Sequence, residues 1–510
     1  MMTKLAILLF VFLKSALCVN ILHIAQVASP SHHIWNRALA FGLAEKGYNI
    51  TMVSHDKEKE KHKNFHLILL EGIYDHTYEG FSMESLTETT VLEGIKILYD
   101  WSLLCCKHDF ATKGLQTLLN YPKDFKFDLI IFDVTVEQCL YPLIERFHNP
   151  PVIGVTPFLL PPVLSHAWGN PLQTAYWPYF STKFTTKMSF TERILNFIYT
   201  HAEVLYRRYI ALPAEMQLAQ EFFGKDIRPL EEVERNISLL LSNSDPILIF
   251  PVNVPPNIIP VGGLQIKPPK PLPEDLKDIV DKAKDGIILF TLGSNLRSDE
   301  FSPEKRKVIL NTFAKLPQTV LWKFETDNLE GLPKNVVIRK WLPQSDILGH
   351  PKTRLFINHG GGLGTQETMY HGVPVVGFPF FVDHVGNLAR LEHRKMGKSI
   401  DFTKLTVENF YGAITEVLNN PIYTENIKKA SKKFRDQPQT PLERGVFWVE
   451  HVLRHGGGEH LVLAARDMSF YQTMNLDILI VVVLLVILVY SVILLVFTVL
   501  RFLLGISSRR

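Results

Sequence analysis

The feature that most constrains the fold of this chain is an apolar run that leads into a glycine cluster. Residues 355–357 read Leu-Phe-Ile, and glycines occupy positions 360–362. A strand that enters a glycine loop and then a helix presents free backbone N–H groups to an anion, because glycine allows close approach and the helix start is electropositive. Gly372 and Pro374 indicate the helix end, and a second apolar run follows at 375–378. The sequence therefore predicts a strand–loop–helix–strand unit with a diphosphate site at its glycine loop.

Side chains around this unit are suited to hold a nucleotide. Glu367 falls in the second turn of the predicted helix, where its carboxylate can accept hydrogen bonds from ribose hydroxyls. Trp341 offers a ring on which a base can stack. Each candidate binding residue in and around this unit also has an alternative, purely structural role. These roles are a core residue for Trp341, a helix-start residue bonding its own backbone for His359, a turn residue for Ser294 and a loop carboxylate for Asp383.

The spacing of this region resembles the signature of the UDP-glycosyltransferases, and is most similar to the membrane-bound UDP-glucuronosyltransferases of animals. The resemblance covers nearly the whole chain. The residues that carry it are Trp341, Gln344, His359, Gly360, Gly361, Glu367, Asp383 and Asn387, with the Phe-Thr-Leu-Gly-Ser run at 290–294 and Asp-Gln-Pro at 436–438.

The resemblance assigns each of these side chains to one part of a UDP-sugar. From base to sugar, the expected contacts are Trp341 to uracil, Gln344 to base or ribose, Glu367 to ribose, then Ser294, His359 and the amides of Gly360, Gly361 and Gly362 to the diphosphate, and Asp383 with His384 to the sugar. The chain departs from the common pattern at Leu363, where Asn is frequent, and at His384, where Gln is usual.

Glycosyl transfer to a hydroxyl needs a base that takes the acceptor proton. His32 is predicted to lie in the loop after the first strand, residues 21–25, and Asp133 ends another apolar strand at 127–133. The carboxyl ends of parallel strands share one edge, so Asp133 is expected to reach the far ring nitrogen of His32 and fix its tautomer. The family resemblance agrees with this pair. His32 as a plain helix-start residue, and His33 as the base, remain alternatives.

Alternating apolar strands and helices predict an α/β fold with two doubly wound, Rossmann-like domains facing a cleft; the resemblance implies the GT-B type. We expect residues 20–245 to bind the acceptor and 286–450 to bind the UDP-sugar, with a proline-rich linker at 246–285. The acceptor pocket is expected to use the aromatic-rich, irregular region 161–221 and residues 75–115.

Both ends of the chain carry membrane signals. Residues 1–19 are predicted to be a signal peptide, and 478–500 a transmembrane helix that follows a juxtamembrane segment at 451–477. A buried soluble helix is the alternative to the span. Arginines in 501–510 predict a cytosolic tail and lumenal domains, a single-pass type I topology. Placement in the endoplasmic reticulum follows from the resemblance alone.

Composition and motif content argue against some classes of partner. The net charge is only +3, without a basic stripe, so nucleic acid is not an expected partner. No Asp-x-Asp pair occurs in a strand-end loop, so we expect UDP-sugar as co-substrate with no cofactor and no metal. Of the cysteines outside the signal peptide, Cys105, Cys106 and Cys139 form an odd set for which no disulfide framework is predicted. Of two sequons, Asn236 is the predicted glycosylation site, whereas Asn49 falls on a predicted buried strand.

Three functions compete. The first is an enzyme that moves glucose or glucuronate from UDP to a hydroxyl of a small lipophilic acceptor, with a slight preference for UDP-glucose drawn from invertebrate relatives. The second is a UDP-sugar-binding partner without turnover in a hetero-oligomer, suggested by Leu363 and His384; homo-oligomers are also expected as an option. The third, an esterase using the His-Gly-Gly-Gly run, needs a Gly-x-Ser-x-Gly elbow, which the sequence lacks.

Overall fold

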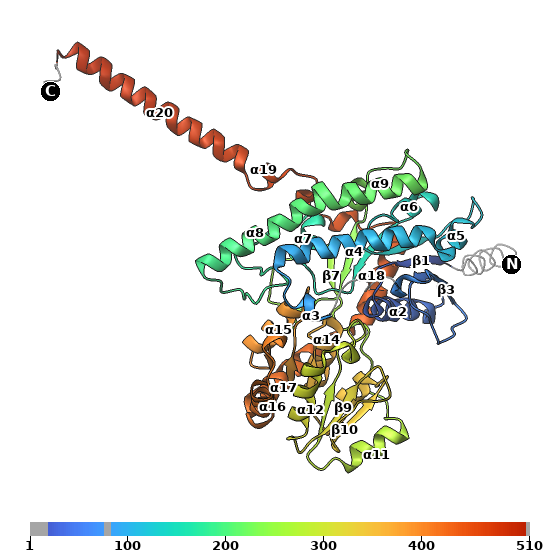
Figure 1. The fold of residues 1–510 in the computed structure, drawn as a ribbon. Helices are drawn as coiled ribbons and strands as arrows, with labels where there is room; N and C mark the ends of the chain where they lie inside the picture. Colours follow the sequence, from blue (N-terminus) through green and yellow to red (C-terminus); the bar gives the residue numbers. More distant parts are fainter. Residues whose placement is uncertain (1–18, 76–82, 506–510) are drawn as a thin grey trace, which may run out of the picture.

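Two parallel sheets organise the computed structural model, which describes residues 19–75 and 83–505 (Figure 1). Residues 1–18 of the expected signal peptide and 506–510 of the expected tail lie outside the described residues. Helices cover both faces of each sheet. The predicted α/β class with two doubly wound domains is confirmed.

The first sheet has seven parallel strands in the order β3-β2-β1-β4-β5-β6-β7. The order reverses between β1 and β4, which creates a crevice at the carboxyl ends of these strands. The strands are β1 (Asn20–Ala25), β2 (Asn49–Ser54), β3 (Phe65–Leu69), β4 (Leu129–Asp133), β5 (Val152–Thr156), β6 (Leu239–Ser242) and β7 (Ile258–Pro260).

The second sheet has six parallel strands in the order β10-β9-β8-β11-β12-β13, with the same reversal between β8 and β11. The predicted strand that enters the glycine loop is β11, and the one that follows the helix is β12. The strands are β8 (Ile287–Phe290), β9 (Thr319–Lys323), β10 (Val336–Arg339), β11 (Thr353–Asn358), β12 (Val375–Gly377) and β13 (Gly397–Ser399).

The expected linker and the expected irregular region both contain regular structure. β7 lies inside 246–285 and pairs with β6, so part of that stretch belongs to the first sheet. The prediction of irregular structure across 161–221 is wrong, because three helices occupy much of it. The helices of the first domain are α2 (Pro30–Glu45), α3 (Met83–Leu86), α4 (Val91–Ala111), α5 (Lys113–Leu119), α6 (Pro142–Arg146), α7 (Pro162–Ala167), α8 (Phe190–Tyr206), α9 (Leu212–Phe223) and α10 (Leu230–Arg235).

The C-terminal part of the chain returns to the first domain. Val446, Val449 and Val452 of α18 pack in one apolar cluster with Trp35 and Leu39 of α2. Burial of these side chains ties the end of the second domain to the first sheet. The remaining helices are α11 (Glu274–Lys282), α12 (Pro303–Phe313), α13 (Gln344–Leu348), α14 (Gly362–His371), α15 (His384–His393), α16 (Val407–Asn419), α17 (Pro421–Arg435), α18 (Pro441–His455), α19 (Phe470–Thr473) and α20 (Leu476–Leu503).

A disulfide joins Cys106 to Cys139, with Cα atoms 6.1 Å apart. The expectation of no disulfide is therefore wrong. The pair arises because α4 packs over the loop that follows β4, a contact between positions 33 residues apart that cysteine counting cannot reveal. Cys105 is the odd member, free and buried.

Helix α20 projects away from the two domains (Figure 1). It is 28 residues long, contains the expected span 478–500 and exposes its apolar side chains throughout. By length and composition it can cross a membrane. The alternative of a buried soluble helix does not fit a helix without buried residues.

Candidate active site

His32 and Asp133 meet at the carboxyl edge of the first sheet. His32 Nδ1 lies 2.7 Å from Asp133 Oδ2, and both side chains are buried. His32 stands in the first turn of α2 rather than in the predicted loop, because Pro30 begins the helix and its fixed φ suits that position. The helix start thus holds the imidazole over the end of β4.

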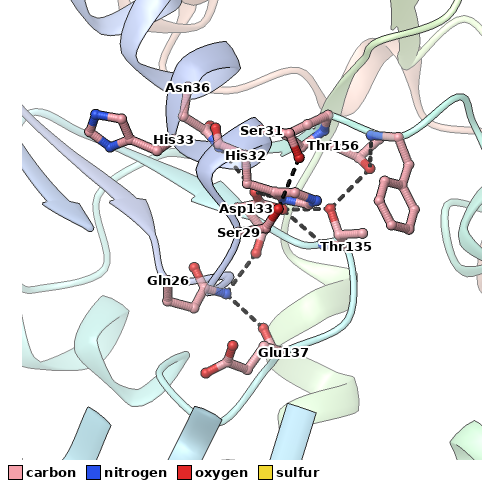
Figure 2. A network of polar contacts seen from close by, with 12 residues as sticks. Gln26, Ser29, Ser31, His32, His33, Asn36, Asp133, Thr135, Glu137 and Thr156 are labelled. Atoms are coloured by element: carbon pink, nitrogen blue, oxygen red, sulfur yellow. Dashed lines mark hydrogen bonds and ion pairs between the residues drawn. The ribbon is translucent and has the colours of Figure 1, made fainter. Parts of the chain in front are cut away.

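Asp133 is held by donors on both carboxylate oxygens (Figure 2). Asn36 Nδ2 donates to Oδ2 at 3.0 Å, and Thr135 donates to Oδ1 from Oγ1 at 2.6 Å and from its backbone N at 3.2 Å. A carboxylate held in this way accepts the Nδ1 proton of His32 and leaves Nε2 as the basic nitrogen. The ring edge of Phe158 packs against His32 with centroids 5.2 Å apart.

The neighbouring histidine, His33, is not placed to replace His32 as the base. His33 Nδ1 pairs with Ser54 Oγ at 2.8 Å, and its ring points away from Asp133 (Figure 2). Sequence reasoning missed Asn36 and Thr135. Their signal was present in the spacing: Asn36 follows His32 by one helical turn, and Thr135 follows Asp133 by two residues.

The glycine loop forms as predicted between β11 and α14. Gly360 has φ +85°, and a Cβ there would lie 2.9 Å from the carbonyl oxygen of His384, so only glycine fits without a backbone shift. Its N–H donates to Asn358 Oδ1 at 3.0 Å. α14 then starts at Gly362 with its N-terminus at the loop. This is the electropositive helix start that a diphosphate site requires.

Two buried polar atoms beside this loop have no partner among the described residues. They are His359 Nδ1 and Asn358 Nδ2. Burial, followed by the charge of Lys323, lowers the pKa of His359 to about 3, so its imidazole is neutral and can donate one N–H. Lys323 Nζ donates to the carbonyl of Gly293 at 2.8 Å, next to exposed Ser294. Sequence reasoning missed this lysine at the end of β9.

The residues expected at the base and ribose also gather. Gln344 Nε2 donates to Glu367 Oε2 at 2.5 Å, and Thr291 Oγ1 donates to Gln344 Oε1. Burial raises the pKa of Glu367 to about 7. Trp341 is 70% exposed, which excludes its interpretation as a core residue.

The residues expected at the sugar lie at the start of α15. Asn387 Nδ2 donates to Asp383 Oδ2 and to the carbonyl of Gly360, both at 2.7 Å, which ties Asp383 to the glycine loop. Burial raises the pKa of Asp383. Arg390, which sequence reasoning missed, donates to Asn387 Oδ1 and lines a small cavity with Asp383.

His384 does not behave as its unperturbed pKa suggests. Burial and then the nearby His359 hold its pKa well below the usual range, since the two rings lie 4.5 Å apart. Burial therefore favours the neutral imidazole of His384.

The parts of the site on the two domains face each other directly. Asn295 Nδ2 donates to Ser29 Oγ at 2.9 Å, next to Ser294 on one side and α2 on the other. Burial raises the pKa of Asp383, and His32 on the other side of the domain boundary opposes that rise. A cavity of about 200 Å³ lies beside the 379–385 loop. Both regions expected to form the acceptor pocket line it, through residues 86–98 and 179–183.

The fold and site define a two-domain glycosyltransferase of the GT-B architecture. Solved structures agree in fold: the spinosyn forosaminyltransferase SpnP covers 86% of this chain and 100% of its own at TM-score 0.56 and 15% identity. Os79 from O. sativa, in complex with U2F and trichothecene, covers 85% and 100% at TM-score 0.55 and 16% identity.

Sequence relatives specify the family. The profile described as UDP-glucoronosyl and UDP-glucosyl transferase matches residues 26–510, and the chain belongs to this UDP-glycosyltransferase family. It is 33% identical over 491 residues to UDP-glycosyltransferase UGT5 of Dactylopius coccus, covering 95% of this chain and 92% of the relative. It is 35% identical to human UDP-glucuronosyltransferase 2B7, covering 76% and 72%. The protein is a UDP-sugar-dependent transferase, and the alternative of a partner without turnover is not favoured.

Proposed function

We propose that this enzyme transfers glucose from UDP-glucose to a hydroxyl of a small lipophilic acceptor, with inversion and with His32 as the base. The observation that carries the proposal is the buried His32–Asp133 pair at the domain boundary. In a single displacement, Nε2 takes the acceptor's proton, the acceptor oxygen bonds to the anomeric carbon, and the bond from that carbon to UDP breaks. Asp133 stabilises the imidazolium that forms.

The donor is proposed to lie along the second domain. The N-terminus of α14, neutral His359 and Ser294 face the diphosphate, and the helix start supplies the positive charge that offsets the leaving group. The proposal uses no metal or cofactor. Glu367 and Gln344 hold the ribose, and Trp341 stacks on the base.

Glucose is proposed over glucuronate because Asp383 accepts hydrogen bonds from sugar hydroxyls but repels a carboxylate. A relative in Dactylopius coccus named UDP-glucosyltransferase 2 is 34% identical over 459 residues, 88% of this chain. Glucuronate is the second candidate, since Arg390 is a cation in the cavity that Asp383 lines. Competition between UDP-glucose and UDP-glucuronate, measured with wild type and Arg390→Gln, separates the two. If wild type prefers glucuronate and Arg390→Gln loses that preference, glucuronate replaces glucose as the proposed donor.

The cellular setting completes the proposal. We infer a signal peptide at the N-terminus, anchoring in the endoplasmic reticulum membrane by α20, and lumenal domains with a glycan on Asn236. Asn236 is exposed at the end of α10. Asn49, the asparagine of the other sequon, is the first residue of β2, and its side chain donates a hydrogen bond to that of Asn20.

The base is tested by His32→Ala with His33→Ala as the matched control. General-base catalysis is commonly worth about 10²-fold or more, so His32→Ala should lose at least that factor in kcat while retaining UDP affinity. His33→Ala should keep most activity if it folds. A rate for His32→Ala above roughly a tenth of wild type would assign the base elsewhere.

A further inference from the structure

A histidine stands inside the core of the first domain, in a strand that is otherwise apolar there. His23 lies in the middle of β1, and it is fully buried, as are its neighbours Leu22 and Ile24. It shares one face of the strand with Ile21 and Ala25, which pack against helix α2. A buried polar side chain costs free energy unless it is hydrogen-bonded, so the partner of His23 matters.

The partner of His23 is the side chain of Asn36 in α2. His23 Nε2 lies 2.8 Å from Asn36 Oδ1, and both residues are fully buried. An amide oxygen only accepts hydrogen bonds, so His23 Nε2 carries the proton. His23 Nδ1 has no partner among the described residues. Burial, opposed by the hydrogen bond to Asn36, lowers the pKa of His23 to about 4, so the ring is a neutral donor at neutral pH.

The nitrogen of the Asn36 amide points at the His32–Asp133 pair. Asn36 Nδ2 donates to Asp133 Oδ2 and to the backbone carbonyl of His32, both at 3.0 Å. If the amide oxygen and nitrogen exchanged places, Oδ1 would face these two acceptors and Nδ2 would face the N–H of His23. Every contact would then pair two acceptors or two donors. The proton on His23 therefore fixes the orientation of the Asn36 amide.

Hydrogen bonds thus connect the core of the sheet to the predicted base. The oxygen that accepts from Asn36, Asp133 Oδ2, also accepts from His32 Nδ1 at 2.7 Å. A donor to this oxygen favours the ionised carboxylate. The bond from Asn36 to the carbonyl of His32 also ties the first turn of α2 to the end of β4. In a buried network of this kind each bond polarises the next.

We propose that His23 and Asn36 are positioning residues for the transfer reaction. The N–H of His23 orients the amide of Asn36, and that amide holds the carboxylate of Asp133. The carboxylate keeps His32 in the tautomer with its proton on Nδ1, so that Nε2 can take the acceptor's proton. The inference rests on His32 being the base, as proposed above. His23 itself is fully buried and acts only through its neighbours.

The first test compares two replacements of His23 in the full-length enzyme. His23→Leu fills the site in the strand but removes the donor, so kcat should fall by about tenfold, the order of one hydrogen bond to a charged group. His23→Gln restores an N–H at a similar reach, and its kcat should stay within about threefold of wild type. UDP affinity should be unchanged in both variants, because the nucleotide residues lie on the second domain. If His23→Leu does not fold, His23→Met takes its place with the same expected loss.

A double-mutant cycle separates positioning from general packing. Asn36→Leu should lower kcat by about tenfold, and adding His23→Leu should cost less than about twofold more, because the chain of bonds is already broken. His55→Leu is the matched control. His55 is a buried histidine just after β2 that bonds to the carbonyl of Leu70, outside this chain of bonds. Its replacement should leave kcat near that of wild type.

Four results would overturn the proposal. They are wild-type kcat in His23→Leu, equal loss in His23→Gln and His23→Leu, losses that multiply in the double variant, and an equal loss in His55→Leu. The base assignment is tested separately, since it fails if His32→Ala keeps its rate. An inactive His32→Ala beside a fully active His23→Leu would remove the positioning role and leave the proposed function intact.

Discussion

At the scale of single residues, the site works by combining burial with specific partners. Asp133 is a buried carboxylate whose partners all donate to it, and His32 is the one that can pass a proton to and from a substrate. Burial lowers the pKa of both His359 and His384, and the carboxylate beside His384, that of Asp383, lies 4.0 Å from its Nε2. Burial therefore favours the neutral form of these two imidazoles, whereas the ring of His32 has a carboxylate at hydrogen-bond distance.

Asp133→Asn is expected to reduce kcat by about 10²-fold or more, because an amide cannot stabilise the imidazolium and allows the wrong tautomer of His32. Thr135→Val should cost less, since it removes only one donor to the carboxylate. UDP affinity and the melting temperature serve as controls for folding. Wild-type kcat in Asp133→Asn would show that His32 acts without this partner.

Glu367 predicts a pH dependence of donor binding. Burial raises its pKa to about 7, so in the free enzyme the carboxyl is protonated below that pH and ionised above it. Ribose hydroxyls donate better to the ionised form, so UDP-glucose affinity should rise by up to about tenfold from pH 6 to pH 8. Calorimetric titration at both values measures it. Glu367→Gln should abolish the slope, and an equal slope in that variant would assign the effect to another group.

At the scale of secondary-structure elements, the disulfide fixes α4 against the loop that follows Asp133. Closing a loop of about this length is worth about 2–4 kcal/mol. Cys106→Ser with Cys139→Ser should therefore lower the unfolding free energy by that amount, measured by denaturant titration. Cys105→Ser, which removes only the free thiol, is the matched control. Equal stability of the double variant and wild type would contradict the expected contribution.

The sequence predicts elements well where one chemical pattern has one structural meaning. Buried parallel strands read as apolar runs, and the glycine loop at 360–362 marks the strand-to-helix turn, so both sheets and the nucleotide loop could be anticipated. Strand β7 was not predicted, because a strand of three residues among prolines shows no hydrophobic periodicity. Helix α8 was not predicted, although a capping box of Ser189 with Glu192 and apolar residues spaced by three and four positions indicate it in the sequence.

Site residues were predictable where a position at a strand end determines the neighbours. The pairing of His32 with Asp133 follows from the shared edge of β1 and β4. The low pKa of His384 could not be foreseen, because it depends on the ring of His359 from a different loop. Arg390 was hidden for the same reason, since its place beside Asp383 requires the coordinates of α15.

At the scale of the whole molecule, contacts between the two domains hold the carboxyl edge of the first sheet, which carries His32, against the second domain. Gln366 of α14 donates to the carbonyl of Asn243 at 2.8 Å, and Arg444 of α18 donates to that of Pro260 at 3.0 Å. These contacts lie on the nucleotide helix and on the returning helix, respectively. The proton acceptor on one domain is thereby held toward the donor site on the other.

The orientation of this body relative to the membrane gives the last prediction. Arg501 follows the apolar part of α20, and the positive-inside rule places that end in the cytosol and both domains in the lumen. An epitope inserted in the exposed turn at 224–226 should therefore resist protease in sealed microsomes and be digested after detergent is added. Asn236→Gln should remove one glycan from the same protein, since only a lumenal sequon is modified. Loss of the epitope in sealed vesicles would reverse the topology and place both domains in the cytosol.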